Sequence, residues 1–169
     1  GQQGDRVAEI ADYTRVIDLP GATPEQVVDA LYNRGITHGQ QGDSAAAIAD
    51  YTCVIDLPGA PPEQVAWALN NRGVAHLNNG QKREAESDFE TILSLHGAPV
   101  TLTIEAHLAL GAICLSEGRW SDGFKAIESS LTLGAEQSPN YFDAPVDVIG
   151  VLFGAGLTLE GRRKHSTML

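Results

Sequence analysis

Basic residues are scarce in this chain of 169 residues, which has 11 Lys and Arg against 22 Asp and Glu and a formal net charge of -11. A protein that binds nucleic acid needs a basic face to offset phosphate charge, and an anionic membrane surface attracts the same kind of face. The composition therefore argues against nucleic-acid and membrane partners. It favours neutral or basic ones.

Cysteine and long apolar runs are also scarce. Cys53 and Cys114 are too far apart in sequence to indicate a disulfide framework or a metal site, and two free thiols predict a cytoplasmic location. The longest apolar run, residues 146–159, contains Asp147 and is too short to span a bilayer. The first ten residues are polar and lack the pattern of a secretory signal. With 43% hydrophobic and 20% charged residues, the chain has the composition of a soluble globular protein.

What the sequence does contain is a repeat. The letters GQQGD open the chain and return at residues 39–43, and residues 1–38 match residues 39–76 at 28 of 38 positions. The same offset continues more faintly and aligns two sets of glycines: Gly35, Gly73 and Gly111, and Gly42, Gly80 and Gly118. Self-similarity at a fixed period predicts an architecture in which each unit buries its apolar face on its neighbours.

Each repeat is predicted to form two helices. The first runs from about Pro62 to Asn79, because a proline is tolerated in the first turn and Gly80 then interrupts the helix. The second is clearest at residues 43–57, where Asp43 is suited to be the N-cap. Apolar residues follow Asp43 at helical spacing, and Pro58-Gly59 ends the segment.

These features resemble the tetratricopeptide repeat family. The matching positions are the small residue in the middle of the first helix, the glycine at the turn, and the small residue entering the second helix. They also include the large apolar residue one turn later: Tyr51, Phe89 and Ile127. The resemblance implies an all-α fold, a right-handed superhelix of antiparallel helix pairs. The period of 38 exceeds the family's usual 34.

Two arginines also depart from the family pattern. Arg34 and Arg72 stand where the family usually has leucine. We expect them to pair with a nearby carboxylate, with Asp12, Asp50 and Asp56 as the candidates.

The predicted organisation is a single repeat domain over residues 1–169. It begins with a lone second helix (1–22) and continues with three full helix pairs (23–60, 61–98 and 99–135). A final first helix (144–161) and a polar tail (162–169) follow. Because repeat arrays need polar caps and this pattern lacks them, we expect the chain to be part of a longer array. The alternative is that the two ends of different copies dock head to tail.

No catalytic, cofactor or metal site is expected. His38 and His76 occupy the same repeat position, which favours packing over metal binding. The glycines recur with the repeat and do not form a phosphate-binding run after a strand. An enzyme with its site in the groove or at residues 135–145 remains an alternative, because a fold alone does not exclude catalysis.

The predicted function is a non-enzymatic scaffold that binds a protein or peptide in the concave groove. By resemblance, the groove positions are Tyr32, Asn33, Ile36, Gln40, Trp67, Asn70, Asn71, Val74, Asn78 and Leu108. An asparagine amide can donate to and accept from a peptide backbone, and aromatic residues often anchor binding. For the asparagines the alternative is a hydrogen bond to the adjacent helix. Because the groove positions carry no Lys or Arg, we do not expect a clamp for a C-terminal carboxylate.

The alternative function is self-assembly into homo-oligomers through the helical ends. The apolar residues predicted for that contact lie on the final helix: Val148, Val151, Leu152, Phe153 and Leu157.

Overall fold

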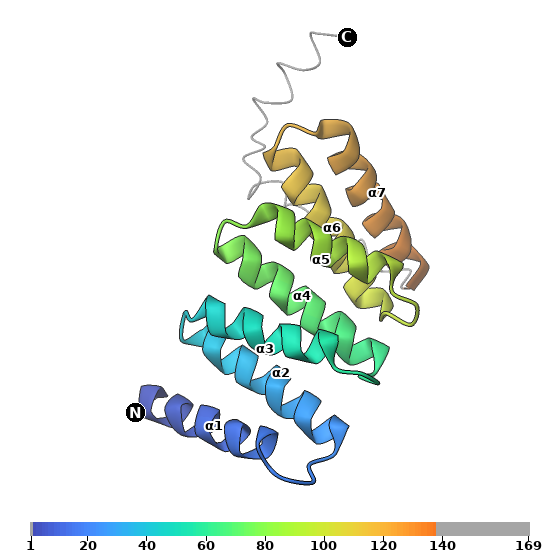
Figure 1. Ribbon diagram of the computed structural model, residues 1–169. Coiled ribbons are helices and arrows are strands. Elements are labelled where there is room, and N and C mark those ends of the chain that lie inside the picture. The colour runs from blue at the N-terminus through green and yellow to red at the C-terminus, as the bar shows by residue number, and fades with distance from the viewer. Residues whose placement is uncertain (1, 138–169) are drawn as a thin grey trace, which may run out of the picture. The chain divides into compact units, whose positions relative to one another are not determined.

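The computed structural model describes residues 2–137, and over this range every regular element is an α-helix (Figure 1). The helices are α1 (Gln2–Ile17), α2 (Pro24–Gln40), α3 (Ser44–Asp56), α4 (Pro62–Asn78), α5 (Lys82–Ser94), α6 (Val100–Ser116) and α7 (Trp120–Gln137). The all-α helical repeat fold predicted from the sequence is confirmed, and the handedness of the superhelix stays a prediction. The predicted helix at 144–161 and its apolar side chains lie outside the described residues.

The chain forms two compact units. The first, Gly1–Pro99, holds α1 to α5, and the second begins at Val100 with α6 and α7. This boundary falls one residue from the predicted junction between the helix pairs at 61–98 and 99–135.

Local sequence explains where the helices of the first unit begin. Thr23 and Gln26 form a capping box at the start of α2: the Thr23 hydroxyl accepts from the Gln26 amide (3.3 Å), and the Gln26 side chain accepts from the Thr23 amide (2.9 Å). Asp43 caps α3 as predicted, with its carboxylate accepting from the Ala46 amide at 3.0 Å. In the next repeat Pro61 replaces Thr23, and α4 begins without a side-chain cap.

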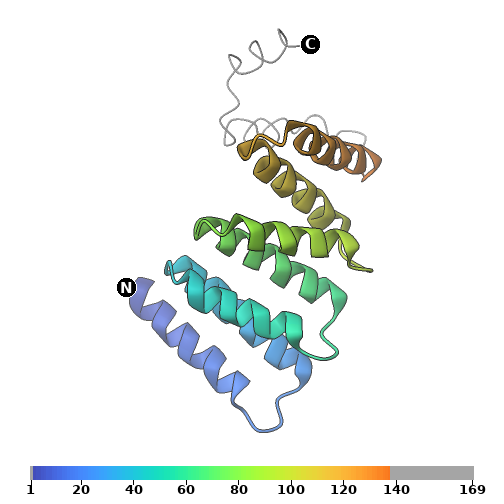
Figure 2. The same ribbon diagram turned by 45° about the horizontal axis from the view of Figure 1, so that its top comes forward.

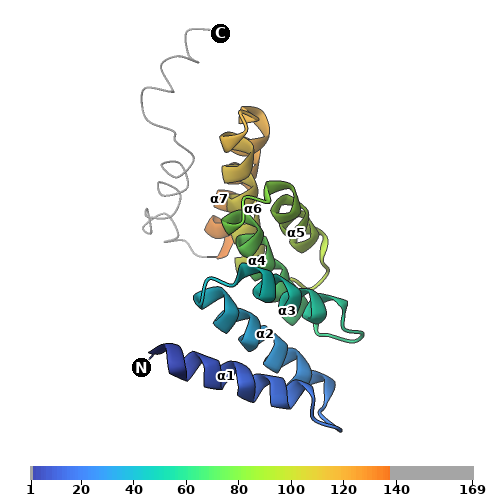
Figure 3. The same ribbon diagram turned by 60° about the vertical axis from the view of Figure 1, so that its left-hand side comes forward.

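Consecutive helices of the first unit pack against one another in chain order, and α2 also contacts α4. Figures 2 and 3 show α2 and α4 on one side of this unit and α3 and α5 on the other. One core cluster includes Leu31 from α2, Tyr51 and Val54 from α3, and Ala68 from α4. The helices α2 and α4 therefore lie next to each other in one layer of the first unit, and residues of both helices contribute to the surface on that side.

The mid-helix glycines permit close approach within each helix pair. A Cβ atom on Gly35 would lie 2.7 Å from the Tyr51 ring, and one on Gly73 would lie 2.8 Å from the Phe89 ring. In the second unit a Cβ atom on Gly111 would lie 2.8 Å from Ile127. These apolar side chains therefore fill the space beside the small residue of each pair.

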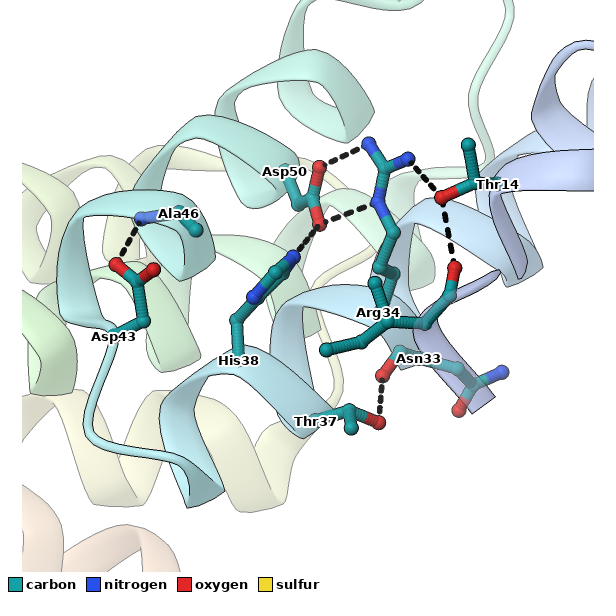
Figure 4. Close-up of polar contacts among 9 residues, drawn as sticks. Thr14, Asn33, Arg34, Thr37, His38, Asp43, Ala46 and Asp50 are labelled. Atoms are coloured by element: carbon teal, nitrogen blue, oxygen red, sulfur yellow. Dashed lines mark hydrogen bonds and ion pairs between the residues drawn. The ribbon is translucent and has the colours of Figure 1, made fainter. Parts of the chain in front are cut away.

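Arg34 pairs with Asp50, one of the three carboxylates predicted for it (Figure 4). Its Nε and Nη2 donate to the two carboxylate oxygens at 2.9 and 2.6 Å, and its Nη1 donates to the Thr14 hydroxyl at 2.9 Å. This side-chain cluster joins α1, α2 and α3. The hydrogen bonds to Asp50 raise the pKa of Arg34, so the guanidinium stays charged.

The same three-helix cluster recurs one repeat later. Arg72 donates to Asp88 at 3.0 and 2.6 Å and to the Thr52 hydroxyl at 2.9 Å, which joins α3, α4 and α5. Asp88 is buried, like Asp50, and a buried carboxylate requires a partner of this kind. We call these two sets, Thr14–Arg34–Asp50 and Thr52–Arg72–Asp88, the arginine clasps.

Candidate binding groove

Two adjoining hollows lie on the α2 and α4 side of the first unit. The first has a volume of about 310 Å³ and is lined by Asp29, Tyr32, Gln64 and Trp67. The second has a volume of about 470 Å³, and its lining is Tyr32, Ile36, Gly39, Gln40, Ser44, Ala47, Tyr51, Asn71, Val74, Ala75 and Asn78. Tyr32 lines both hollows, so they adjoin along α2 and α4, and we call the two together the groove.

Two hydrogen bonds tie α4 to α2 along this groove. The Asn71 amide donates to the Tyr32 hydroxyl at 3.0 Å, and the Gln64 amide donates to a carboxylate oxygen of Asp29 at 3.0 Å. Each bond joins a residue of one repeat to a residue of the repeat before it. The groove is therefore built by the stacking of two repeats, and neither repeat forms it alone.

The two tyrosines of the groove are neutral over the physiological pH range. Burial raises the pKa of Tyr51 to about 12, and burial also raises the pKa of Tyr32 despite the opposing effect of the Asn71 hydrogen bond. The two rings meet in a tilted arrangement, with their centroids 6.0 Å apart. Both phenols are thus fixed hydrogen-bonding groups beside an aromatic surface.

The structure brings together seven of the ten residues predicted for the groove: Tyr32, Ile36, Gln40, Trp67, Asn71, Val74 and Asn78. The other three lie elsewhere. Asn33 donates to the Asp29 carbonyl of its own helix at 2.8 Å, Asn70 lines neither hollow, and Leu108 lies on α6 in the second unit. The amides of Asn33 and Asn71 are both engaged within the protein, the first along its own helix and the second across the repeat stack.

Sequence reasoning missed the contributions of Gln64 and of α3. Gln64 precedes Trp67 by three residues and so lies on the same helix face, a spacing that could have identified it. Ser44, Ala47 and Tyr51 line the second hollow from the start of α3. All ten groove positions predicted by resemblance lie on the first helices α2, α4 and α6.

A family model described as "Tetratricopeptide repeat" matches residues 28–59 and 68–96. These two segments are tetratricopeptide repeats. They correspond to the helix pairs α2–α3 and α4–α5, the same pairs that build the groove. No curated protein and no solved structure matches the chain.

Tetratricopeptide repeats are in general protein–protein interaction modules and non-enzymatic scaffolds. The helix pair α6–α7 lies outside the matched segments, although it has the same close contact of a mid-helix glycine with a large apolar residue. Within residues 2–137 no helix has both the length and the apolarity that a bilayer-spanning segment requires.

The histidines of the tetratricopeptide repeats lie beside the arginine clasps. His38 Nε2 is 3.9 Å from Asp50, and His76 Nε2 is 3.9 Å from Asp88. Across residues 2–137 no three His, Cys, Asp or Glu side chains are grouped so that they could hold a metal ion. The two histidines thus have the same position relative to the clasp of their own repeat.

Proposed function

We propose that the tetratricopeptide repeats of the first unit bind an extended peptide segment of a partner protein in the groove between α2 and α4. The observation that supports this proposal is that the two hollows adjoin at Tyr32. Adjoining hollows lined by side chains of two stacked repeats can contact several successive residues of one peptide. The role proposed is that of a non-enzymatic scaffold.

The groove offers both apolar and polar contacts to such a peptide. Trp67 is 37% exposed and Val74 is 46% exposed, so both present apolar surface to a ligand. Gln40 and Asn78 add amide groups at the rim of the second hollow, and an amide can both donate to and accept from a peptide backbone. Exposed apolar groups next to amides are typical of a protein-binding surface.

The net charge of -11 favours a neutral or basic partner. A cytoplasmic location fits the two free thiols, because the exposed Cys53 is kept reduced most readily in a reducing compartment. The partner proposed is therefore a protein segment without a net negative charge, met in the cytoplasm.

Selection from a displayed library of random linear peptides tests the proposal with the whole chain. Peptides that bind the wild type should bind the Val74→Arg variant at least about 10-fold more weakly, because a charged side chain would then occupy the second hollow. Val7→Arg is the matched control, since Val7 is 60% exposed on α1 and lines neither hollow. Equal loss of binding in both variants, or no peptide enrichment at all, would contradict the groove as the binding site.

Self-association is the second candidate function, and the exposure of Val7 favours it. The equivalent positions of the later repeats hold Ala45, Arg83 and Ser121, so α1 presents a larger apolar side chain at this point than any of them. The residues predicted for the other side of such a contact, on the helix at 144–161, lie outside the described residues. If copies associate through α1, Val7→Arg should lower the mass measured by light scattering at high concentration, and Val74→Arg should leave it unchanged.

A further inference from the structure

We propose that the first hollow of the groove is a pocket for a lysine or arginine side chain of the bound peptide. This pocket, lined by Asp29, Tyr32, Gln64 and Trp67, is called the cation pocket below. The proposal rests on the proposed function and adds the chemical class of residue that the groove recognises.

Charge is the first argument. Among the described residues that line the two hollows, Asp29 is the only one with a charged side chain. Gln64 donates to one of its carboxylate oxygens at 3.0 Å, which orients the group from the neighbouring helix. A carboxylate has two acceptor oxygens, so Asp29 can also accept hydrogen bonds from a bound cation. The cation pocket is thus an anionic site at one end of an otherwise neutral groove.

The aromatic lining also suits a cation. Tyr32 and Trp67 both line the cation pocket, and the faces of aromatic rings attract ammonium and guanidinium groups. Tryptophan is the strongest of the aromatic residues in this interaction. The volume of about 310 Å³ is at the lower end of the range for ligand pockets, about 300–1,000 Å³. That size suits one side chain better than a whole small molecule.

The two nearly identical repeats differ mostly at positions that line the groove. Residues 1–38 and 39–76 differ at 10 positions (38 minus the 28 that match), and 6 of these 10 pairs include a residue that lines a hollow. The pairs are Arg6 and Ser44, Glu9 and Ala47, Asp29 and Trp67, Tyr32 and Asn70, Ile36 and Val74, and Thr37 and Ala75.

Exposure alone does not explain where these differences fall. Away from the groove some exposed positions differ, namely Val7 and Ala45, Arg15 and Cys53, and Thr23 and Pro61, whereas others are unchanged, such as Asp18 with Asp56 and Glu25 with Glu63. Asp29 supplies the carboxylate of the cation pocket and Trp67 supplies the indole. These two residues occupy the same position in the two repeats. Divergence of the two copies has therefore supplied a pocket that identical repeats could not form.

The groove also sets the spacing of the peptide that it would accept. Asp29 and Gln40 are 11 residues apart on α2, which corresponds to about 16 Å along a helix. An extended peptide covers that distance with about five residues. The expected ligand has a lysine or arginine at one end of such a segment and uncharged residues over the second hollow.

The test is a double-mutant cycle with the whole chain and a peptide selected from the random display library. Each Lys or Arg of the peptide is replaced in turn by Gln, and affinities are measured by calorimetry for the wild type and for Asp29→Asn. One replacement should weaken binding to the wild type about 10-fold and binding to Asp29→Asn less than about 2-fold. The Asn side chain retains an acceptor for Gln64, so circular dichroism should show an unchanged fold.

Glu25→Gln is the matched control. Glu25 is an exposed carboxylate on the same helix and lines neither hollow, so this variant should keep the full preference for the cationic peptide. One outcome would overturn the cation pocket and leave the groove in place. In that outcome Val74→Arg weakens binding of the selected peptides, but the Gln replacements in the peptide weaken binding equally for the wild type and for Asp29→Asn. Failure to select any peptide would contradict both.

Discussion

At the scale of single residues, the arginine clasps explain an apparent anomaly of the sequence. Arg34 and Arg72 occupy positions where an apolar residue would be expected between packed helices, and each instead satisfies a buried aspartate and the threonine of the preceding second helix. In the second unit the equivalents of Arg72 and Asp88 are Leu110 and Ala126. Where the arginine of the clasp is replaced by leucine, the aspartate is thus replaced as well, by alanine.

This correspondence leads to a prediction about stability. Arg72→Leu alone should lower the free energy of unfolding by about 3 kcal/mol or more, because it leaves Asp88 buried without its partner. Arg72→Leu combined with Asp88→Ala should recover much of that loss, since it reproduces the residues of the helix pair α6–α7. Urea unfolding followed by circular dichroism measures both. Equal destabilisation in the single and double variants would contradict the pairing argument.

Tyr51 should make stability fall at alkaline pH. Its pKa is raised to about 12 by burial, while in the unfolded chain it titrates near 10. The contribution of Tyr51 to the free energy of unfolding is therefore complete below pH 10. It is lost as the pH rises towards 12, because the unfolded state releases the phenol proton first. Urea unfolding at pH 9, 10 and 11 measures the free energy of unfolding at each pH. Over this range it should fall by about 1 kcal/mol less for Tyr51→Phe than for the wild type. Parallel decline in the two proteins would show that burial does not perturb this phenol.

At the scale of elements, the contact between a mid-helix glycine and a ring sets how closely two helices of a repeat approach. Gly35 and Gly39 lie on the same helix but differ in what surrounds them. A Cβ atom would be 2.7 Å from the Tyr51 ring at Gly35, whereas at Gly39 the nearest atom is the Ala47 Cβ at 4.0 Å. The first position is constrained by packing and the second by helix propensity alone.

Alanine substitutions at these two glycines should therefore have opposite effects. Gly35→Ala should destabilise the protein by about 1–3 kcal/mol, because the ring of Tyr51 would have to move. Gly39→Ala should stabilise it by about 0.5 kcal/mol through the higher helix propensity of alanine. Thermal unfolding of both variants gives the comparison. A stabilised Gly35→Ala variant would show that the helix pair has room that the packing does not indicate.

The elements that could be predicted from the sequence are those that depend on local signals. The glycine at each turn and the glycine contacts recur at a fixed offset, so each occurrence supports the others, and the Asp43 cap follows from the residue type at the start of its own helix. The Asn71 to Tyr32 and Gln64 to Asp29 bonds could not be predicted in the same way. They join different repeat positions across the stack, and their partners depend on how α4 lies against α2.

At the scale of the whole molecule, an acidic chain carries a groove with mixed chemistry. The net charge of -11 attracts basic segments at long range, and this attraction should weaken as salt is added. Selection at short range is assigned to the groove of the first unit, where apolar, amide and carboxylate groups of two repeats are adjacent. Charge alone would attract many partners, so we propose that the specificity comes from the groove.

The most direct test of the central claim is an NMR titration of the isotope-labelled whole chain with a peptide selected by display. We predict that the largest chemical-shift changes fall on the groove between α2 and α4, including the Trp67 indole N–H, the Asn71 side-chain amide and the backbone amide of Val74. The Trp120 indole, on α7 in the second unit, serves as the internal reference and should move little. Changes centred on α1, on the outer faces of α3 and α5, or on the second unit would contradict the assignment of binding to this groove.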